Sequence, residues 1–190
     1  MYNLLRNIHL YLGLASCLFL LMYGVSAIQM SHPDWFANSA IKSQTTVRIE
    51  GASPDGRAVA RELMDKHGLR GELRRVSNTP SGFSLAIGRP GTDHTVEYNR
   101  STGEAKIATR TAPFIGMLNG IHHVAGMWHT YGVLNWWGVC VLAVSAGLFV
   151  IAGTGVYLWF KLRPERRTGA VLLVFSLAYS VTVIILLRTA

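Results

Sequence analysis

The 190-residue chain is poor in cysteine and in charge, and both shortages limit what the protein can be. Its two cysteines, Cys17 and Cys140, lie far apart, which excludes a disulfide-stapled scaffold, a thiolate zinc site and a cysteine-held iron–sulfur cluster. Only 15% of the residues are charged while 50% are hydrophobic, a balance that disfavours a purely water-soluble enzyme. The sequence also lacks the motifs G-x-S-x-G and H-E-x-x-H, so no catalytic residue is assigned.

The net charge of +8 is distributed as in a membrane protein rather than as in a nucleic-acid-binding protein. Residues 31–112 hold 12 of the 18 Lys and Arg residues and 9 of the 10 Asp and Glu residues. The remaining basic residues flank apolar runs. We therefore expect the lipid bilayer as the partner of this chain, and no nucleic acid.

Long uncharged stretches predict three transmembrane helices. About 23 residues from Ile8 to Met30 carry no formal charge, enough to cross a hydrocarbon layer about 30 Å thick. This run is longer than the apolar part of a signal peptide and is not followed by an A-x-A-like site, which favours a retained anchor. No charged residue lies between Arg110 and Lys161, and we place the second span from about Leu134 to Phe160. The third span runs from about Gly169 to Leu187.

Basic residues predict the orientation of these helices. Arg6 precedes the first span, and the short loop between the second and third spans contains Lys161, Arg163, Arg166 and Arg167. Positive charge stays on the cytoplasmic side, so we expect the N-terminus in the cytoplasm and residues 31–112 outside. In a bacterial cell this places the protein in the inner membrane with residues 31–112 in the periplasm.

Residues 31–112 are expected to form a small α+β insert. Ser53 is the predicted N-cap of a helix, with Pro54 at its first position, and Gly68 is the predicted end. Three alternating segments then predict strands, and a fourth segment adds another. The residues that fall at helical spacing are Val59, Ala60, Leu63 and Met64; those of the three strands are Phe83, Leu85 and Ile87, then Val96 and Tyr98, then Ala105 and Ile107, and Leu73 with Val76 indicates the further strand.

The charge-free stretch before the second span is too long to lie wholly inside the membrane. We expect Phe114 to Met127 to lie nearly flat on the membrane surface, with an apolar stripe formed by Phe114, Met117, Leu118, Ile121 and Ala125. The predicted organisation is therefore transmembrane helix 1 (1–30), the insert (31–112), an interfacial helical segment (113–131), transmembrane helix 2 (132–161), and a basic loop with transmembrane helix 3 (162–190).

Several motifs resemble one known family when they are taken in order. The first span begins Arg6-Asn7-Ile8-His9 followed by Gly13, and the second ends Gly153-Thr154-Gly155-Val156-Tyr157-Leu158-Trp159 before a basic tail. The insert contains Val96-Glu97-Tyr98 followed by the turn Ser101-Thr102-Gly103-Glu104, and Ile121-His122-His123 precedes the second span. These motifs resemble the PepSY-associated transmembrane helix family.

This resemblance implies a bacterial inner-membrane protein with three transmembrane α-helices and an extramembrane PepSY-like α+β insert. Some larger relatives are haem-containing reductases of ferric siderophores or related iron complexes, which implies haem b as the cofactor. Those reductases have more helices than this chain. A three-helix version is therefore expected to be a homodimer, a subunit of a larger membrane complex, or a member without the redox role.

The histidines are the candidate haem ligands. A haem b needs imidazoles on its two opposite faces, which means ligands from two facing segments. On one helix, His122 and His129 would lie about 10 Å apart along the axis and would not share a haem. We therefore expect His32 to face one histidine of the group His122, His123 and His129, with His32, His122 and His129 as metal ligands. The alternative is that these side chains only form hydrogen bonds at the membrane surface.

His9 belongs to a different place, because a straight helix would separate it from His32 by about 35 Å. Gly13, Gly153 and Gly155 lie at a similar depth and leave room either for a flat cofactor or for close helix packing. A haem at His9 would need its second ligand from another copy, from a partner, or from a residue other than histidine.

Three functions remain open at this point. The first is a haem-b-binding protein that passes electrons toward ferric iron or siderophore complexes outside the membrane. The second is a non-catalytic accessory subunit of a larger membrane complex, and the third is a regulatory PepSY module that acts on a periplasmic protease. A basic face for anionic iron chelates or an acidic partner is a further hypothesis, against the alternative of a solvated surface; its residues are Arg70, Arg74, Arg75, Arg89 and Lys106.

Overall fold

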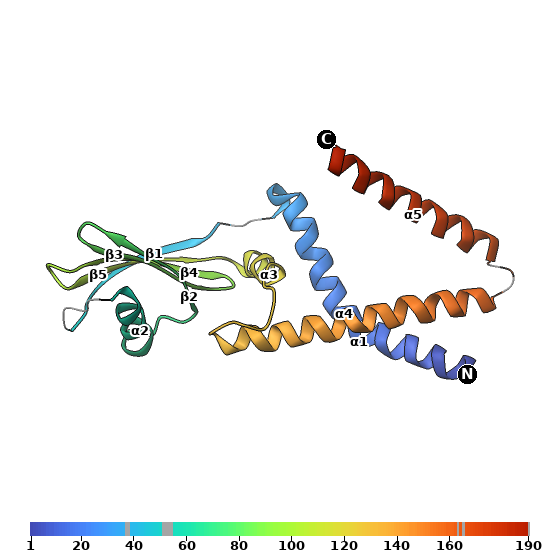
Figure 1. Cartoon of the computed structure of the whole chain (residues 1–190), viewed down its shortest axis with the longest axis horizontal. Coiled ribbons are helices and arrows are strands. Elements are labelled where there is room, and N and C mark those ends of the chain that lie inside the picture. Colours follow the sequence, from blue (N-terminus) through green and yellow to red (C-terminus); the bar gives the residue numbers. More distant parts are fainter. Residues whose placement is uncertain (37–38, 51–54, 163, 165, 190) are drawn as a thin grey trace. The chain divides into compact units, whose positions relative to one another are not determined.

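The computed structural model describes residues 1–36, 39–50, 55–162, 164 and 166–189. Contacts divide the chain into two units, one of Met1–Leu18 with Leu142–Ala190 and the other of Phe19–Val141. The elements, in chain order and labelled as in Figure 1, are α1 (Tyr2–Ser31), the 3-10 helix η1 (Pro33–Trp35), β1 (Ile41–Arg48), α2 (Gly56–Lys66), β2 (Glu72–Thr79), β3 (Gly82–Arg89), β4 (Thr92–Asn99), β5 (Glu104–Thr111), α3 (Phe114–His122), α4 (Gly132–Lys161) and α5 (Arg166–Thr189).

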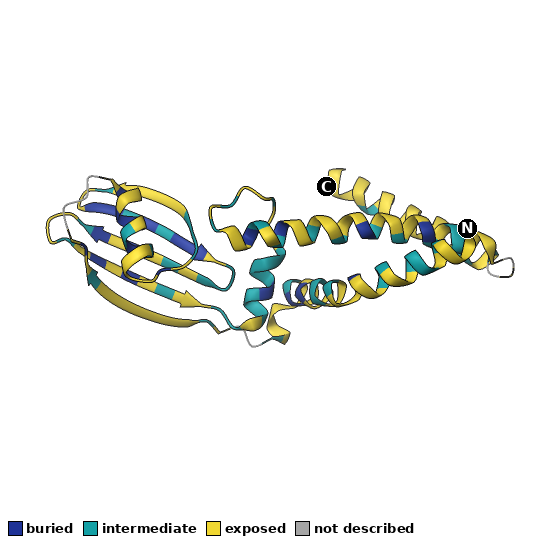
Figure 2. Cartoon of the chain, turned by 90° about the horizontal axis from the view of Figure 1, so that it is seen from below, coloured by how far each residue is buried: buried dark blue, intermediate teal, exposed yellow. Residues whose placement is uncertain are grey.

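Three helices, α1, α4 and α5, are long and apolar enough to cross a membrane. The two longer ones have 30 residues each, or about 45 Å of helix at 1.5 Å per residue, which exceeds the thickness of the hydrocarbon layer. Each predicted span lies inside one of these helices, so the prediction of three membrane helices is confirmed. Figure 2 colours most of their residues as exposed or intermediate, as expected for helices whose apolar surface faces lipid.

Small residues hold α1 and α4 together in the first unit. A Cβ added at Gly147 would lie 3.9 Å from both Leu12 Cδ2 and Ser16 Oγ, an ordinary van der Waals contact. Such small side chains let two membrane helices approach closely. Helix α5 belongs to the same unit, but none of its described residues is buried.

The insert is a five-stranded antiparallel sheet in the order β1-β5-β4-β3-β2. Helix α2 covers one face of it (Figure 1), and the strand segments that Figure 2 colours as buried lie mainly in β3, β4 and β5. Alternation along β3, β4 and β5 sends every second side chain toward α2. The resulting core consists of Ile49, Val59, Ala60, Leu63, Leu69, Phe83, Leu85, Ile87, Val96, Tyr98, Ala105 and Ile107.

The predicted strands are confirmed, but the sequence analysis missed β1. Leu73 and Val76 both lie in β2, as the fourth alternating segment indicated. Strand β1 pairs with β5 from Ile41↔Thr111 to Arg48↔Glu104, and seven of its eight residues are exposed. As an edge strand it is held by backbone hydrogen bonds rather than by an apolar face, so hydrophobic alternation could not reveal it.

The start of α2 differs from the prediction. The predicted N-cap Ser53 and the predicted first-turn Pro54 lie outside the described residues. In the structure the helix begins at Gly56, and Asp55 is its N-cap, accepting a hydrogen bond from the Arg57 backbone N–H at 3.0 Å. Gly68 follows the helix with a φ of +70°, the left-handed conformation that ends many helices.

Helix α3 is shorter than the segment from Phe114 to Met127 that the apolar stripe predicted. It ends at His122, and His123 is its C-cap, so Ala125 and Met127 lie in the non-helical segment before α4. Gly126 has a φ of +88°, and a Cβ there would overlap the Trp128 indole, which excludes a continuous helix through this position. His122 and His129 are therefore not on one helix, and the predicted spacing of 10 Å between them does not apply.

Candidate functional site

His122 is held by α1 in an orientation that leaves one ring nitrogen free. Its ring packs against Tyr23 with centroids 4.4 Å apart, and its Nδ1 lies 2.6 Å from Ser26 Oγ. The Ser26 hydroxyl already donates to the Tyr23 carbonyl, so Nδ1 must be the donor to Ser26 Oγ. In the neutral ring, Nε2 then carries the lone pair, and it has no hydrogen-bond partner among the described residues.

Aromatic rings surround this contact. Phe19 stacks on Tyr23 at 4.7 Å and on Trp137 at 5.3 Å between centroids. Trp137 comes from α4, so the stack joins α1, α3 and α4 within the second unit. The Trp137 indole N–H is buried without a hydrogen-bond partner in the described part of the chain. The stack therefore holds the Tyr23 ring against which His122 packs.

His129 has the opposite arrangement, because both of its ring nitrogens are engaged. Nδ1 lies 3.0 Å from a carboxylate oxygen of Glu72, and Nε2 lies 3.0 Å from the Ala125 carbonyl oxygen. Both partners accept hydrogen bonds, so both nitrogens must carry protons for the two bonds to form together. In this arrangement His129 offers no lone pair to a metal and instead ties the segment before α4 to β2.

Glu72 completes this tie. Its second carboxylate oxygen accepts hydrogen bonds from the Thr130 backbone N–H at 3.1 Å and the Thr130 hydroxyl at 3.3 Å. Burial raises the pKa of Glu72, but the hydrogen bonds from His129 and Thr130 outweigh it and lower the pKa below its ordinary value. Glu72 was not among the residues selected from the sequence, since nothing in its neighbourhood distinguishes it from a surface glutamate.

His32 and His123 are placed differently from each other. His32 precedes η1 and stacks on Trp35, with ring centroids 4.2 Å apart and planes nearly parallel. His123 lies beside His122, with ring centroids 5.9 Å apart. Within the residues that the structure describes, His32 makes no ring contact or hydrogen bond with the histidines near α3, and no cluster of three or more His, Cys, Asp or Glu side chains is arranged to hold a metal ion.

His9 repeats the arrangement of His122 in the other unit. Its Nδ1 lies 3.0 Å from Thr154 Oγ1 and 3.2 Å from the Ile151 carbonyl oxygen. The Thr154 hydroxyl donates to the Val150 carbonyl at 2.7 Å, which again makes the histidine the donor. Nε2 of His9 has no hydrogen-bond partner in the described ranges.

The glycines near His9 have different roles. A Cβ at Gly155 would lie 3.2 Å from His9 Cε1, so this glycine makes room for the imidazole itself. A Cβ added at Gly13 or at Gly153 would have no neighbouring atom within 4 Å. Ser26 and Thr154, the partners of the two histidines, were not selected from the sequence; the available signal was a polar residue within a long apolar helix.

A cavity of about 690 Å³ lies beside α3 in the second unit, and we call it the α3 cavity. One wall is the face of α3 formed by Gly116, Asn119, Gly120 and His123, which are spaced to lie along one side of the helix. The opposite wall is the turn between β3 and β4, where Pro90 lies within van der Waals reach of Gly120. Arg74, Arg89 and Arg110 line the same cavity, together with Glu72, Asp93 and His129.

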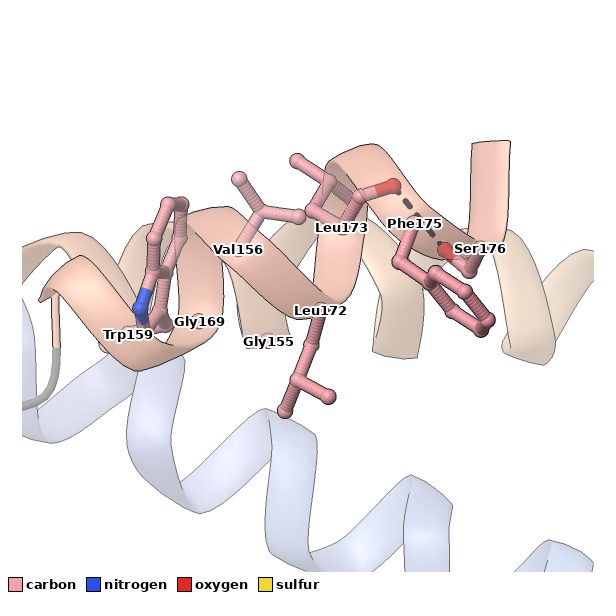
Figure 3. Close-up of a pocket in the computed structure, with 8 residues that line it drawn as sticks. All are labelled: Gly155, Val156, Trp159, Gly169, Leu172, Leu173, Phe175 and Ser176. Atoms are coloured by element: carbon pink, nitrogen blue, oxygen red, sulfur yellow. Dashed lines mark hydrogen bonds between the residues drawn. The ribbon is translucent and has the colours of Figure 1, made fainter. Parts of the chain in front are cut away.

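A second cavity, of about 490 Å³, lies between α4 and α5 (Figure 3). Its lining is mostly apolar, with Val156 and Trp159 from α4 and Leu172 and Phe175 from α5. The Ser176 hydroxyl is already bonded to the Leu173 carbonyl of its own helix. This cavity therefore lacks converging polar groups and has the character of a gap between membrane helices.

The comparison with protein families covers nearly the whole chain. The PepSY_TM-like family model matches residues 3–189, from the start of α1 to the end of α5. No curated protein and no solved structure gives a significant match. Three apolar helices of membrane-spanning length and an α+β insert between the first two agree with the architecture that the motifs implied. The chain is a member of the PepSY_TM-like family.

Proposed function

We propose that this membrane protein binds haem b and that His122 would hold the haem iron. The observation that carries the proposal is the setting of the His122 ring. Its Nδ1–H is fixed by Ser26 and its Nε2 is left with a free lone pair. Histidines that bind metals commonly donate their other ring N–H to a fixed acceptor, which sets the tautomer and orients the ring.

The donor chemistry of the chain fits a haem with two imidazole ligands. His32 and His123 keep ring nitrogens without partners among the described residues, whereas His129 does not. His32, or a histidine of a second copy of the chain, would supply the second imidazole. When bound, haem supplies one-electron transfer. The chain's own part is to hold the imidazole rigidly within the aromatic stack and to keep its Nε2 unprotonated.

His9 provides a second candidate position for haem. Thr154 and Ile151 fix its Nδ1–H in the same way, and Gly155 leaves space for its ring. No other histidine lies in the described part of this unit. A haem at His9 therefore takes its other ligand from a second copy or from a partner protein.

The proposed topology sets the direction of electron transfer across the membrane. Basic residues between α4 and α5 favour a cytoplasmic location for this loop and for the N-terminus. Residues 31–112 then lie in the periplasm of a bacterial cell. In this orientation His9 lies toward the cytoplasmic end of α1, and electrons pass outward to ferric iron or a siderophore complex.

The decisive test is a reduced-minus-oxidised absorption spectrum of the full chain purified in detergent after expression with a haem supply. We expect a b-type band that is lost in His122→Ala. His67→Ala is the matched control, because His67 is exposed and belongs to the insert. A colourless preparation, or an unchanged band in His122→Ala, contradicts His122 as a ligand.

A second candidate function is that of an accessory subunit, and one observation favours it. None of the described residues of helix α5 is buried, and large apolar side chains such as Leu172 and Phe175 are exposed on it. Lipid or another membrane helix can cover this surface. Purification in a mild detergent with analysis of the complex by mass tests the point. A stoichiometric partner protein without haem supports the accessory role, whereas a haem-loaded protein without a partner contradicts it.

A further inference from the structure

The α3 cavity combines shape and charge in a way that haem binding at His122 does not explain. Its volume of about 690 Å³ lies within the range of cavities that hold small organic ligands, which is about 300–1,000 Å³. Gly116 and Gly120 on α3 keep one wall free of side chains. The turn at Pro90 and Gly91 closes the other side, and it is fastened by a hydrogen bond of 2.8 Å from the Ala112 backbone N–H to the Gly91 carbonyl.

Both carboxylates that line the cavity are already paired. Glu72 accepts hydrogen bonds from His129 and Thr130. Asp93 forms an ion pair with Arg74 at 2.7 Å, and a Cβ at position 88 would lie within 3.0 Å of both partners of this pair. Gly88 therefore makes room for the ion pair, which removes the negative charge of Asp93 from the cavity.

Two guanidinium groups remain without a carboxylate partner. Arg89 and Arg110 line the cavity, and neither has an ion pair or a side-chain hydrogen bond in the described part of the chain. Burial, together with the positive charge of Arg89, lowers the pKa of the neighbouring His94. Asp93 opposes this effect on the pKa of His94, but its contribution is smaller than that of Arg89.

A neutral polar group completes the lining. The side-chain oxygen of Asn119 is buried and has no hydrogen-bond partner among the residues that the structure describes. A buried polar atom without a partner destabilises the folded protein by about 1–3 kcal/mol, and a hydrogen bond to a ligand or a water molecule removes this cost. Because this oxygen accepts hydrogen bonds, a hydroxyl group of the ligand would satisfy it, whereas the two guanidiniums offer donors that suit an oxyanion, and the Arg fork matches phosphate oxygens in pairs.

The position of the cavity along the chain indicates the source of this oxyanion. Leu134, in the first turn of the membrane helix α4, contributes to the lining. The ends of membrane helices lie at the level of the lipid headgroups, where phosphate is abundant. From the cavity, its two unpaired arginines and Asn119, we infer that the α3 cavity binds a phosphate ester, which is either the headgroup of an anionic phospholipid or a soluble phosphate ester.

The experiment measures binding of two probes to the full chain in detergent. Native mass spectrometry counts bound phosphatidylglycerol, with phosphatidylcholine as the comparison lipid, and calorimetry measures glycerol 3-phosphate. Arg89→Gln and Arg110→Gln should each weaken binding by about tenfold, the loss expected for one charge-assisted hydrogen bond. Asn119→Asp should also weaken binding, because it places a negative charge in the cavity. Arg75→Gln, an exposed arginine of the same strand as Arg74 that does not line the cavity, should bind like the original chain.

Each outcome either distinguishes a phospholipid headgroup from a soluble phosphate ester or contradicts phosphate binding in the α3 cavity. Phosphatidylglycerol binding that depends on Arg89 and Arg110 supports the headgroup, and dependent binding of glycerol 3-phosphate alone supports a soluble ester. Failure of both probes to bind, equal effects of Arg75→Gln, or no effect of the two arginine substitutions overturns the inference. Circular dichroism of every variant confirms that the sheet is folded, and the haem spectrum is recorded in parallel because it does not depend on this site.

Discussion

The insert and the membrane helices bury opposite kinds of side chain. In the insert the buried residues are apolar, such as Leu63, Val96 and Ile107. In the long helices the buried set includes four polar residues, which are Ser16, Ser26, Gln29 and Thr154, while large apolar side chains are mostly exposed. Water drives apolar groups inward in the first case. Lipid removes that driving force in the second, so helix contacts depend on small residues and hydrogen bonds.

This contrast explains where the candidate site lies. Two of the four buried polar side chains, Ser26 on α1 and Thr154 on α4, hold histidines. Ser26 accepts the Nδ1–H of His122, and Thr154 accepts that of His9. The same residues serve as helix contacts and as orienting partners of imidazoles. In these two cases a polar residue inside a membrane helix marks the histidine that it orients.

The largest predicted effect tests the apolar half of the comparison. Leu63 on α2 is fully buried against the sheet. Leu63→Ala should destabilise the insert by about 2–5 kcal/mol, the usual cost of such a cavity. Leu172→Ala, whose side chain is exposed on α5, should stay within about 0.5 kcal/mol. Hydrogen exchange of the β3–β5 amides in the full chain measures both. Equal protection in the two variants would show that α2 does not support the sheet.

A smaller effect tests the polar half. Ser26→Ala removes the acceptor of His122 Nδ1–H, and an unsatisfied buried donor costs about 1–3 kcal/mol. Helix α3 should therefore exchange its amides faster, with no change in the sheet. Ser31→Ala is the matched control, because the exposed Ser31 hydroxyl bonds only to the Ala27 carbonyl of its own helix. If the α3 amides exchange at the same rate in the two variants, the Ser26–His122 hydrogen bond does not position the histidine.

The sequence predicts the elements of this protein better than their contacts. Uncharged runs and alternating strands are local patterns, so the three spans and the strands β2 to β5 could be recognised directly. Strand β1 has no such pattern, because an edge strand is held by its backbone. The seven-residue spacing of His122 and His129 was read as one helix, although Gly126 interrupts it.

The histidine environments depend on residues distant in the sequence. His122 bonds to a residue 96 positions away and His129 to one 57 positions away. No periodicity connects such pairs, and a single sequence contains no record of which residues meet. Charge gave a coarse guide, since Arg74 and Arg89 were both selected for a basic face. Only the structure separates Arg74, which is paired with Asp93, from Arg89, which is not.

The smallest predicted effect concerns the tie between the insert and the segment before α4. Hydrogen bonds to the ionised carboxylate lower the pKa of Glu72 in the folded protein despite the opposing effect of burial, so the tie contributes stability above the ordinary pKa of 4.5 and loses it as the pH falls through the lowered value. Hydrogen exchange of residues 124–131 should accelerate on acidification, and Glu72→Gln should already exchange faster at neutral pH. The effect is modest because a protonated carboxyl still accepts a hydrogen bond from Thr130. Glu97→Gln, a change at an exposed residue of β4, is the control and should leave the acceleration of exchange on acidification unchanged. If Glu72→Gln also leaves this acceleration unchanged, another group fastens residues 124–131 to the sheet.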